Sequence, residues 1–196
     1  MIVLALGLVV LPKKKGMKET DPKALLSAIS EKSRFLSADL ITHRIIENDP
    51  TLLLIDLRPV NEFKAFALPG AVNIQPDSLL SAISLELLNQ PGKDKVLYAN
   101  SDLTAEKAWL LGTRYSVNRL YILKGGLNEW YNTIIKPGEA SSAVSTSDLD
   151  LLSFRNAARQ YFTGAGQAPQ VQTTKKTPVK VNIIRKAPEA ASGGGC

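Results

Sequence analysis

The 196-residue chain contains a single cysteine, Cys196, at its last position. A thiolate suits sulfur transfer because it serves both as nucleophile and as leaving group. Gly193–Gly195 directly precede it and leave the backbone conformationally free. A flexible segment of about 30 residues has an r.m.s. reach of roughly 30 Å. Cys196 is therefore a candidate mobile sulfur carrier. Three alternatives stay open: a labelling tag, an exposed thiol without a role, and a lipid attachment point, although a final cysteine does not fit the four-residue prenylation signal.

Three charged side chains follow the apolar run Leu52–Ile55, namely Asp56, Arg58 and Glu62. Acid–base catalysis is one interpretation. We favour a structural ion pair between Asp56 and Arg58 that fixes the end of a strand to the next loop, with Glu62 holding Arg58 or a backbone amide. The only histidine, His43, is expected on a helix surface. No Cys, His, Asp and Glu cluster has metal-site spacing and no glycine-rich phosphate loop occurs, so we expect no metal and no cofactor.

The segments that would position these residues alternate between strands and helices. Short apolar runs predict buried strands at 52–55, 96–99 and 120–123, with a further short segment at 71–74. Helices are predicted to begin near Asp21-Pro22, Ser37, Asp77 or Ser78, Thr104, Gly125-Gly126 and Ser147. This alternation predicts an α/β fold of three layers, with a parallel sheet flanked by helices on both faces.

The first eleven residues, Met1–Leu11, are uniformly apolar. Eleven helical residues span roughly 16 Å, about half the thickness of a bilayer core. We interpret residues 1–12 as a membrane anchor whose start lies upstream; the alternative is a buried or frayed segment. Lys13–Lys15 follow directly, which places the domain on the cytoplasmic side of a bacterial inner membrane by the positive-inside rule.

The net charge of +6 arises at the two ends of the chain, because the body is close to neutral. Basic ends beside a neutral body suit an anionic membrane surface, and the lack of interleaved aromatic residues argues against nucleic acid. Residues 164–196 lack periodicity and are expected to be disordered. The predicted organisation is an anchor at 1–12, a linker and lead-in helix at 13–35, the α/β domain at 36–137, a linker and amphipathic helix at 138–163, and a basic tail at 164–196.

Three segments carry a family resemblance. They are Asp56-Leu-Arg58-Pro-Val-Asn-Glu62-Phe63 with Leu68-Pro69-Gly70-Ala71, the stretch Val96–Trp109, and Tyr121-Ile122-Leu123-Lys124-Gly125-Gly126-Leu127-Asn128-Glu129-Trp130. Together these segments resemble the rhodanese-like family in order and spacing, over about residues 36–135. The resemblance implies that Gly125, Gly126 and Trp130 belong to a structural motif of the fold.

The resemblance breaks at the loop after the central strand. In the family a cysteine there attacks a sulfane donor and holds a persulfide, while the loop aims backbone N–H groups at the sulfur. Here the matching residue is Ala99, which has no nucleophilic atom. The degenerate loop consists of Ala99, Asn100, Ser101, Asp102, Leu103 and Thr104. The family commonly has glycine at Asp102 and arginine at Thr104; a carboxylate at 102 would repel thiosulfate or phosphate unless it points away. We therefore expect no classical rhodanese activity.

The whole layout resembles membrane-anchored rhodanese-like proteins with a terminal Gly-Gly-Cys. The first functional hypothesis is an accessory of sulfane-sulfur and thiosulfate handling, with Cys196 as a mobile persulfide carrier. Its expected partner is a membrane sulfur or thiosulfate transporter, or another sulfur-relay protein. The second hypothesis is an inactive binding or scaffold module. In a third, Cys196 reaches back to its own loop, which we rank below the others because of Asp102.

Overall fold

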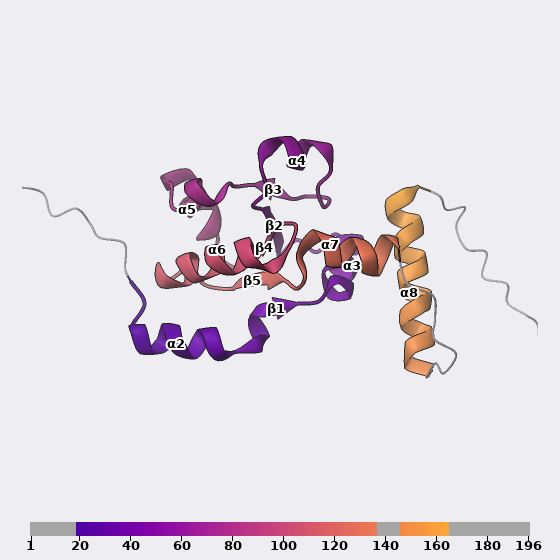
Figure 1. The fold of residues 1–196 in the computed structure, drawn as a ribbon, viewed down its shortest axis with the longest axis horizontal. Coiled ribbons are helices and arrows are strands. Elements are labelled where there is room, and N and C mark those ends of the chain that lie inside the picture. The colour runs from indigo at the N-terminus through magenta and orange to yellow at the C-terminus, as the bar shows by residue number, and fades with distance from the viewer. Residues whose placement is uncertain (1–18, 137–145, 165–196) are drawn as a thin grey trace, which may run out of the picture. The chain divides into compact units, whose positions relative to one another are not determined.

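The computed structural model describes residues 19–136 and 146–164 (Figure 1). The predicted membrane anchor, the basic tail and Cys196 lie outside the described residues. The strands are β1 (Phe35–Leu36), β2 (Leu52–Asp56), β3 (Val72–Asn73), β4 (Asp94–Tyr98) and β5 (Leu120–Leu123). The α-helices are α2 (Pro22–Ser30), α3 (Ala38–Ile46), α4 (Val60–Ala65), α5 (Ala82–Leu88), α6 (Asp102–Arg114), α7 (Gly126–Trp130) and α8 (Thr146–Thr163). Shorter helical segments are η1 (Lys32–Arg34), η2 (Pro76–Ser78) and the π-helical η3 (Tyr131–Ile135).

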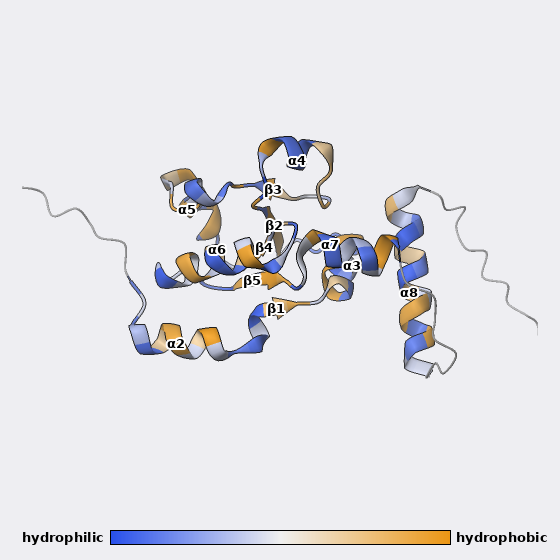
Figure 2. Cartoon of the chain, in the orientation of Figure 1, coloured by the Kyte–Doolittle hydropathy of each residue, from blue (hydrophilic) through white to orange (hydrophobic). Residues whose placement is uncertain are grey.

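The strands form one parallel sheet in the order β1-β5-β4-β2-β3. The central strand β4 pairs with β2 over Leu52–Asp56 and with β5 on its other side. In Figure 2 the strands β1 and β5 carry hydrophobic colour along their length, whereas the helices alternate between hydrophilic and hydrophobic residues. Strands covered by helices on both faces need such continuous apolar runs. The parallel sheet predicted from the sequence is confirmed.

Successive strand residues contribute to different hydrophobic cores, because side chains alternate across a sheet. Ile55, Leu97 and Ile122 belong to one core, together with residues of α5 and α6. Leu54, Val96 and Leu123 belong to the other, together with residues of α3, α7 and α8. The predicted three-layer arrangement follows from this division.

Both tryptophans join helices to the rest of the fold. Trp130 is fully buried, and its indole N–H donates to Thr42 Oγ1 of α3 at 2.8 Å. The indole N–H of Trp109 donates to the carbonyl oxygen of Leu120 at 2.9 Å. A buried indole that finds an acceptor avoids the cost of an unpaired donor.

The predicted start of α2 is confirmed, because Asp21 accepts hydrogen bonds from the N–H groups of Lys23 and Ala24. Two other helix starts differ from the sequence prediction. The helix expected from Thr104 begins two residues earlier, at Asp102. The helix expected from Asp77 or Ser78 begins only after Ser81, whose side chain accepts from the N–H of Ser84. The short η2 precedes it instead.

The C-terminal helix α8 covers α3 and η3. Its Arg155 forms two hydrogen bonds with the carboxylate of Asp39 on α3, at 2.8 and 2.7 Å. Phe162 meets the ring of Trp130 edge-on at a centroid distance of 5.0 Å. Phe162 packs against the core that contains Trp130, whereas the neighbouring Tyr161 is 53% exposed.

An ion-pair network lies at the opposite end of the sheet from the strands' carboxyl ends. Asp94 at the start of β4 receives hydrogen bonds from Arg44 at 2.9 Å and from Arg119 at 2.7 Å. Burial acts to raise the pKa of Asp94, but the hydrogen bond from Arg119 and the charges of Arg44 and Arg119 outweigh it and lower the pKa.

No helix within residues 19–136 and 146–164 has both the length and the apolar character to cross a bilayer.

Candidate functional site

The candidate site lies where the parallel strands β2 and β4 end. Ala99 follows β4 directly, and the chain then turns through Asn100 and Ser101 into α6. Ala99 is 6% exposed, and its methyl group belongs to the core shared with α5 and α6. The carboxyl edge of a parallel sheet is the usual ligand position in such folds. The position that would need a thiol for sulfur transfer therefore holds a methyl group.

The loop at Ala99 rests on the turn formed by Gly125 and Gly126. The N–H of Leu127 donates to the carbonyl oxygen of Ala99 at 2.8 Å, and the N–H of Asn128 donates to that of Asn100 at 3.2 Å. Gly126 has a φ of +63°, and a Cβ there would lie 2.6 Å from the Ala99 carbonyl oxygen. Only glycine permits this approach of two backbones.

The carboxylate of Asp102 points away from the cavity beside Ala99. Its Oδ1 accepts a hydrogen bond of 2.6 Å from the N–H of Gly125. Asp102 does not line that cavity. The anion repulsion expected from this residue type therefore does not act inside the cavity, and the side chain instead ties the start of α6 to the glycine turn.

Asp56 and Arg58 form a buried pair at the end of β2. Asp56 is fully buried and Arg58 is 7% exposed. Arg58 Nε donates to Asp56 at 3.0 Å, Nη2 donates to Asp56 at 2.6 Å, and Nη2 also donates to the Phe66 carbonyl oxygen at 2.5 Å. The hydrogen bonds to Asp56 raise the pKa of Arg58. This pair fixes the strand end to the following loop. Neither side chain of the pair is therefore free to act as a base.

Glu62 connects this pair to the loop after β4. Its Oε2 lies 3.9 Å from Arg58 Nη1 and accepts a hydrogen bond of 2.8 Å from the side-chain amide of Asn100. The neighbouring Tyr98 is fully buried, and its hydroxyl accepts from the N–H of Leu68 at 3.2 Å. Burial, aided by the charge of Asp56, raises the pKa of Tyr98, so this phenol stays neutral. Glu62 therefore holds the loop through Asn100, and Tyr98 fixes the segment at Leu68 to the end of β4.

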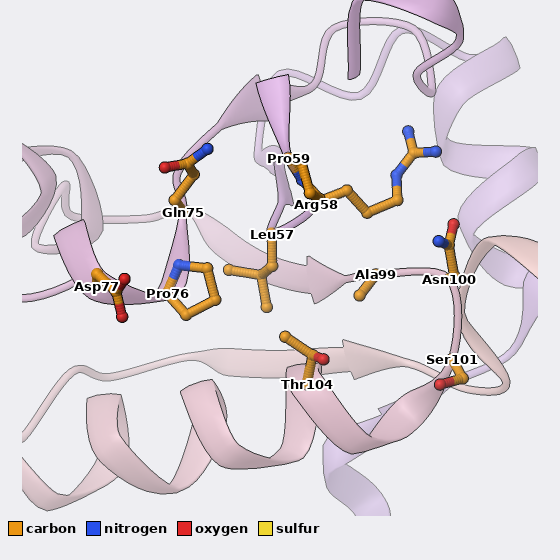
Figure 3. Close-up of a pocket in the computed structure, with 10 residues that line it drawn as sticks. All are labelled: Leu57, Arg58, Pro59, Gln75, Pro76, Asp77, Ala99, Asn100, Ser101 and Thr104. Carbon is orange, nitrogen blue, oxygen red and sulfur yellow. The ribbon is translucent and has the colours of Figure 1, made fainter. Parts of the chain in front are cut away.

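A cavity of about 350 Å³ opens beside Ala99 (Figure 3). Its lining comprises Leu57, Arg58, Pro59, Gln75, Pro76, Asp77, Ala99, Asn100, Ser101 and Thr104. Figure 3 shows the Ala99 methyl directed towards the space between Leu57 and Thr104, while the guanidinium group of Arg58 is directed away from it. The predicted loop residues Ala99, Asn100, Ser101 and Thr104 thus share one cavity.

Two residues of the predicted loop, Asp102 and Leu103, do not line this cavity. Asp102 is bonded to Gly125, as described above. Leu103 lies in the first turn of α6, is 64% exposed, and lines a different hollow with Ile29 and Trp109.

The structure does not include Cys196 among the described residues, so it does not test the carrier role of that thiol. Within the described part of the chain, no group of three or more His, Cys, Asp or Glu side chains is placed to bind a metal ion.

The wall made by Gln75, Pro76 and Asp77 was missed from the sequence, which suggested Asp77 only as a helix cap. These residues follow β3, which pairs with β2 on the side away from β4. The sequence could have indicated these residues, because the predicted apolar segment 71–74 must end at the same edge of a parallel sheet as Asp56 and Ala99. Residues that follow it were candidates for the cavity wall.

Residues 38–133 match the family model described as the rhodanese-like domain. A curated relative, the adenylyltransferase and sulfurtransferase UBA4 of Meyerozyma guilliermondii, is 33% identical over 91 residues; the match covers 42% of this chain and 20% of that protein. This chain therefore spans about a fifth of the relative's length.

Two solved structures are also similar. The rhodanese-like domain of the Alr3790 protein from Anabaena is 20% identical at a TM-score of 0.46, over 57% of this chain and 92% of that one. The human single-domain sulfurtransferase TSTD1 is 19% identical at a TM-score of 0.42, over 50% of this chain and 96% of that one.

Proposed function

Because residues 38–133 belong to the rhodanese-like domain family, we propose that this protein is an accessory of sulfane-sulfur and thiosulfate handling in which Cys196 carries the sulfur. The observation that carries the proposal is Ala99. Its methyl group lines the cavity, at the position where sulfur transfer needs a nucleophile. A chain with one thiol can hold a persulfide only on that thiol, which is Cys196.

The proposed loading step conserves atoms and electrons without an added oxidant. The Cys196 thiolate attacks the terminal sulfur of a donor persulfide, a new S–S bond forms on Cys196, and the donor's S–S bond breaks. The donor leaves as a thiolate, which takes up a proton from water. With thiosulfate as donor, the leaving group is sulfite. The product in either case is a persulfide on Cys196 that a second thiol can accept.

The proposed setting is a membrane surface. The apolar residues 1–12 and the basic ends of the chain support attachment to an anionic bilayer, with the domain on the cytoplasmic side. A sulfur or thiosulfate transporter, or another sulfur-relay protein, would then supply or accept the sulfur. Flotation of the full chain with anionic vesicles tests the attachment, and loss of flotation on removal of residues 1–12 is the expected result.

Intact mass spectrometry tests the carrier role. After incubation with a low-molecular-weight persulfide, the wild-type protein should gain ~32 Da, one sulfur atom. The Cys196→Ser variant should gain nothing, because Ala99 offers no second acceptor. The carrier role is wrong if the wild-type mass stays unchanged under conditions that load a known persulfide carrier, or if Cys196→Ser gains the same mass.

A binding module without sulfur chemistry is the second candidate, and the formed cavity at a residue without a nucleophile is the observation that favours it. The two candidates differ in a cell-based assay of sulfur transfer. Loss of transfer in Cys196→Ser supports the carrier, whereas unchanged transfer together with loss of function on blocking the cavity supports the binding module.

A further inference from the structure

Exposed apolar side chains gather on α2 and α6, which contact each other. Leu26 of α2 is 66% exposed, and Leu103 of α6 is 64% exposed. Leu103, Leu110 and Ile29 line one hollow of about 180 Å³. Lys107 lies on the same line of α6 as the two leucines, because residues three and four apart are neighbours on a helix surface. These five side chains are called the α2–α6 surface below, an apolar area with one lysine within it.

The hollow in this surface also holds positive charge that no carboxylate pairs with. Arg34 and Lys107 line the hollow, and neither forms an ion pair within residues 19–136 and 146–164. Arg34 Nη1 donates to two backbone carbonyl oxygens at the end of α2. Its guanidinium group lies over the rings of Phe35 and Trp109, 4.5 and 5.1 Å from their centroids. Glu106 is the one acidic residue of the lining, so two positive charges and one negative charge leave a net charge of +1.

The chain reaches this surface directly from its apolar first residues. The N–H of Thr20 donates to the carbonyl oxygen of Arg114 at 2.8 Å, and its hydroxyl donates to that of Thr113 at 2.7 Å, so this point is fixed to the last turn of α6. Residues 12–18, four of which are lysines, span at most roughly 25 Å when fully extended. The 13-residue α6 is itself roughly 20 Å long. A bilayer that holds residues 1–11 therefore lies within reach of the α2–α6 surface.

We propose that the α2–α6 surface docks on an anionic lipid bilayer and sets the orientation of the domain there. Its leucine and isoleucine side chains enter the boundary between headgroups and acyl chains, and Arg34 and Lys107 meet lipid phosphates. Docking on this side holds the cavity beside Ala99 close to the membrane, because Leu103 directly precedes Thr104 of the cavity lining. The inference rests on the proposed membrane setting, but not on Cys196.

A fluorescent label tests whether this surface meets lipid. The full chain carries Cys196→Ser and Ser30→Cys, so that a polarity-sensitive fluorophore attaches only beside Ile29, at an exposed position of α2. Ser153→Cys is the matched control, because Ser153 is an exposed serine of α8, which packs into the core on the other face of the sheet. With vesicles that contain phosphatidylglycerol, emission from residue 30 should rise and shift to shorter wavelength. Emission from residue 153 should stay unchanged.

Substitutions of exposed leucines measure the apolar contribution. With the label at residue 30, Leu26→Gln together with Leu103→Gln should lower the ratio of docked to undocked protein by about tenfold, the effect expected of two leucines that are buried only in part. The control pair is Leu40→Gln with Leu149→Gln, which changes exposed leucines of α3 and α8 and should leave the ratio unchanged. Both pairs should still float with vesicles, because residues 1–12 are intact.

Lys107→Gln measures the electrostatic contribution. On phosphatidylglycerol vesicles it should lower the same ratio by about fivefold, the size expected of one lysine near an anionic surface. This difference should shrink as salt is added, because ions screen the charge of the surface. Lys64→Gln, which changes an exposed lysine of α4 that does not line the hollow, should leave the ratio unchanged.

The possible failures are distinguishable. Flotation of the full chain without an emission change at residue 30 overturns the docking surface and leaves the attachment by residues 1–12 standing, whereas loss of flotation overturns both. Emission from residue 30 that is already shifted without vesicles, and that loses this shift when residues 1–12 are removed, identifies those residues as the occupant and overturns the proposal. Equal loss of docking in the surface pair and the control pair also overturns it. None of these results bears on the carrier role of Cys196.

Discussion

Gly126→Ala should destabilise the domain far more than an ordinary glycine substitution. The new Cβ would lie 2.6 Å from the Ala99 carbonyl oxygen, 2.8 Å from the Ser101 nitrogen and 2.9 Å from the Asn100 carbonyl carbon. All three atoms are backbone, so none can move aside by a rotamer change. Alanine at a φ of +63° adds a conformational cost of about 1–2 kcal/mol. With overpacking of about 1–3 kcal/mol, the expected loss of unfolding free energy is about 2–5 kcal/mol.

Gly92→Ala separates the two contributions. Gly92 has a φ of +73°, but a Cβ there would meet nothing within 4 Å. It should cost about 1 kcal/mol, because only the backbone conformation is unfavourable. Urea denaturation followed by tryptophan fluorescence measures both variants, with equal m-values as the check on two-state behaviour. Equal destabilisation by the two substitutions would refute the close approach of the glycine turn to the Ala99 loop.

Two other substitutions test the cavity and the ion pairs. Ala99→Cys in a Cys196→Ser background should gain ~32 Da from a persulfide donor, because the start of α6 lowers the pKa of a thiol there; a folded variant that stays unmodified contradicts this. Asp94→Asn should lose about 1–3 kcal/mol of stability at pH 7. Since the folded pKa of Asp94 lies below its unfolded value near 3.9, this difference should vanish as pH falls through the folded pKa; urea titrations between pH 2 and 7 measure it.

The sheet was predictable because buried parallel strands leave an unambiguous pattern. The runs at 52–55, 96–99 and 120–123 overlap β2, β4 and β5, each buried on two faces. β3 lies within the short apolar segment predicted at 71–74. The two-residue β1 was missed, since its pairing depends on β5, which is distant in sequence. The short helix α4 was missed for a related reason, because six residues do not establish a helical period.

The site was predictable in its residue types but not in its side-chain directions. Ala99 was identified because a strand end and a glycine turn fix its place in the sequence. The direction of Asp102 was not predictable, because it depends on the Gly125 N–H, which is 23 residues away. The contribution of Asp77 depends on the pairing of β3 with β2. Electrostatics inside a cavity follow from such distant contacts, so residue types alone did not show which carboxylate lines the cavity.

The Ala99 loop is held by contacts that do not involve the side chain of residue 99. Gly126 packs on its backbone, Asp102 bonds to Gly125, and Glu62 accepts from Asn100. Each contact comes from a different element, so the support of the loop does not depend on the side chain at residue 99. The cavity can therefore keep its shape without a nucleophile at residue 99, so its shape alone does not indicate catalysis.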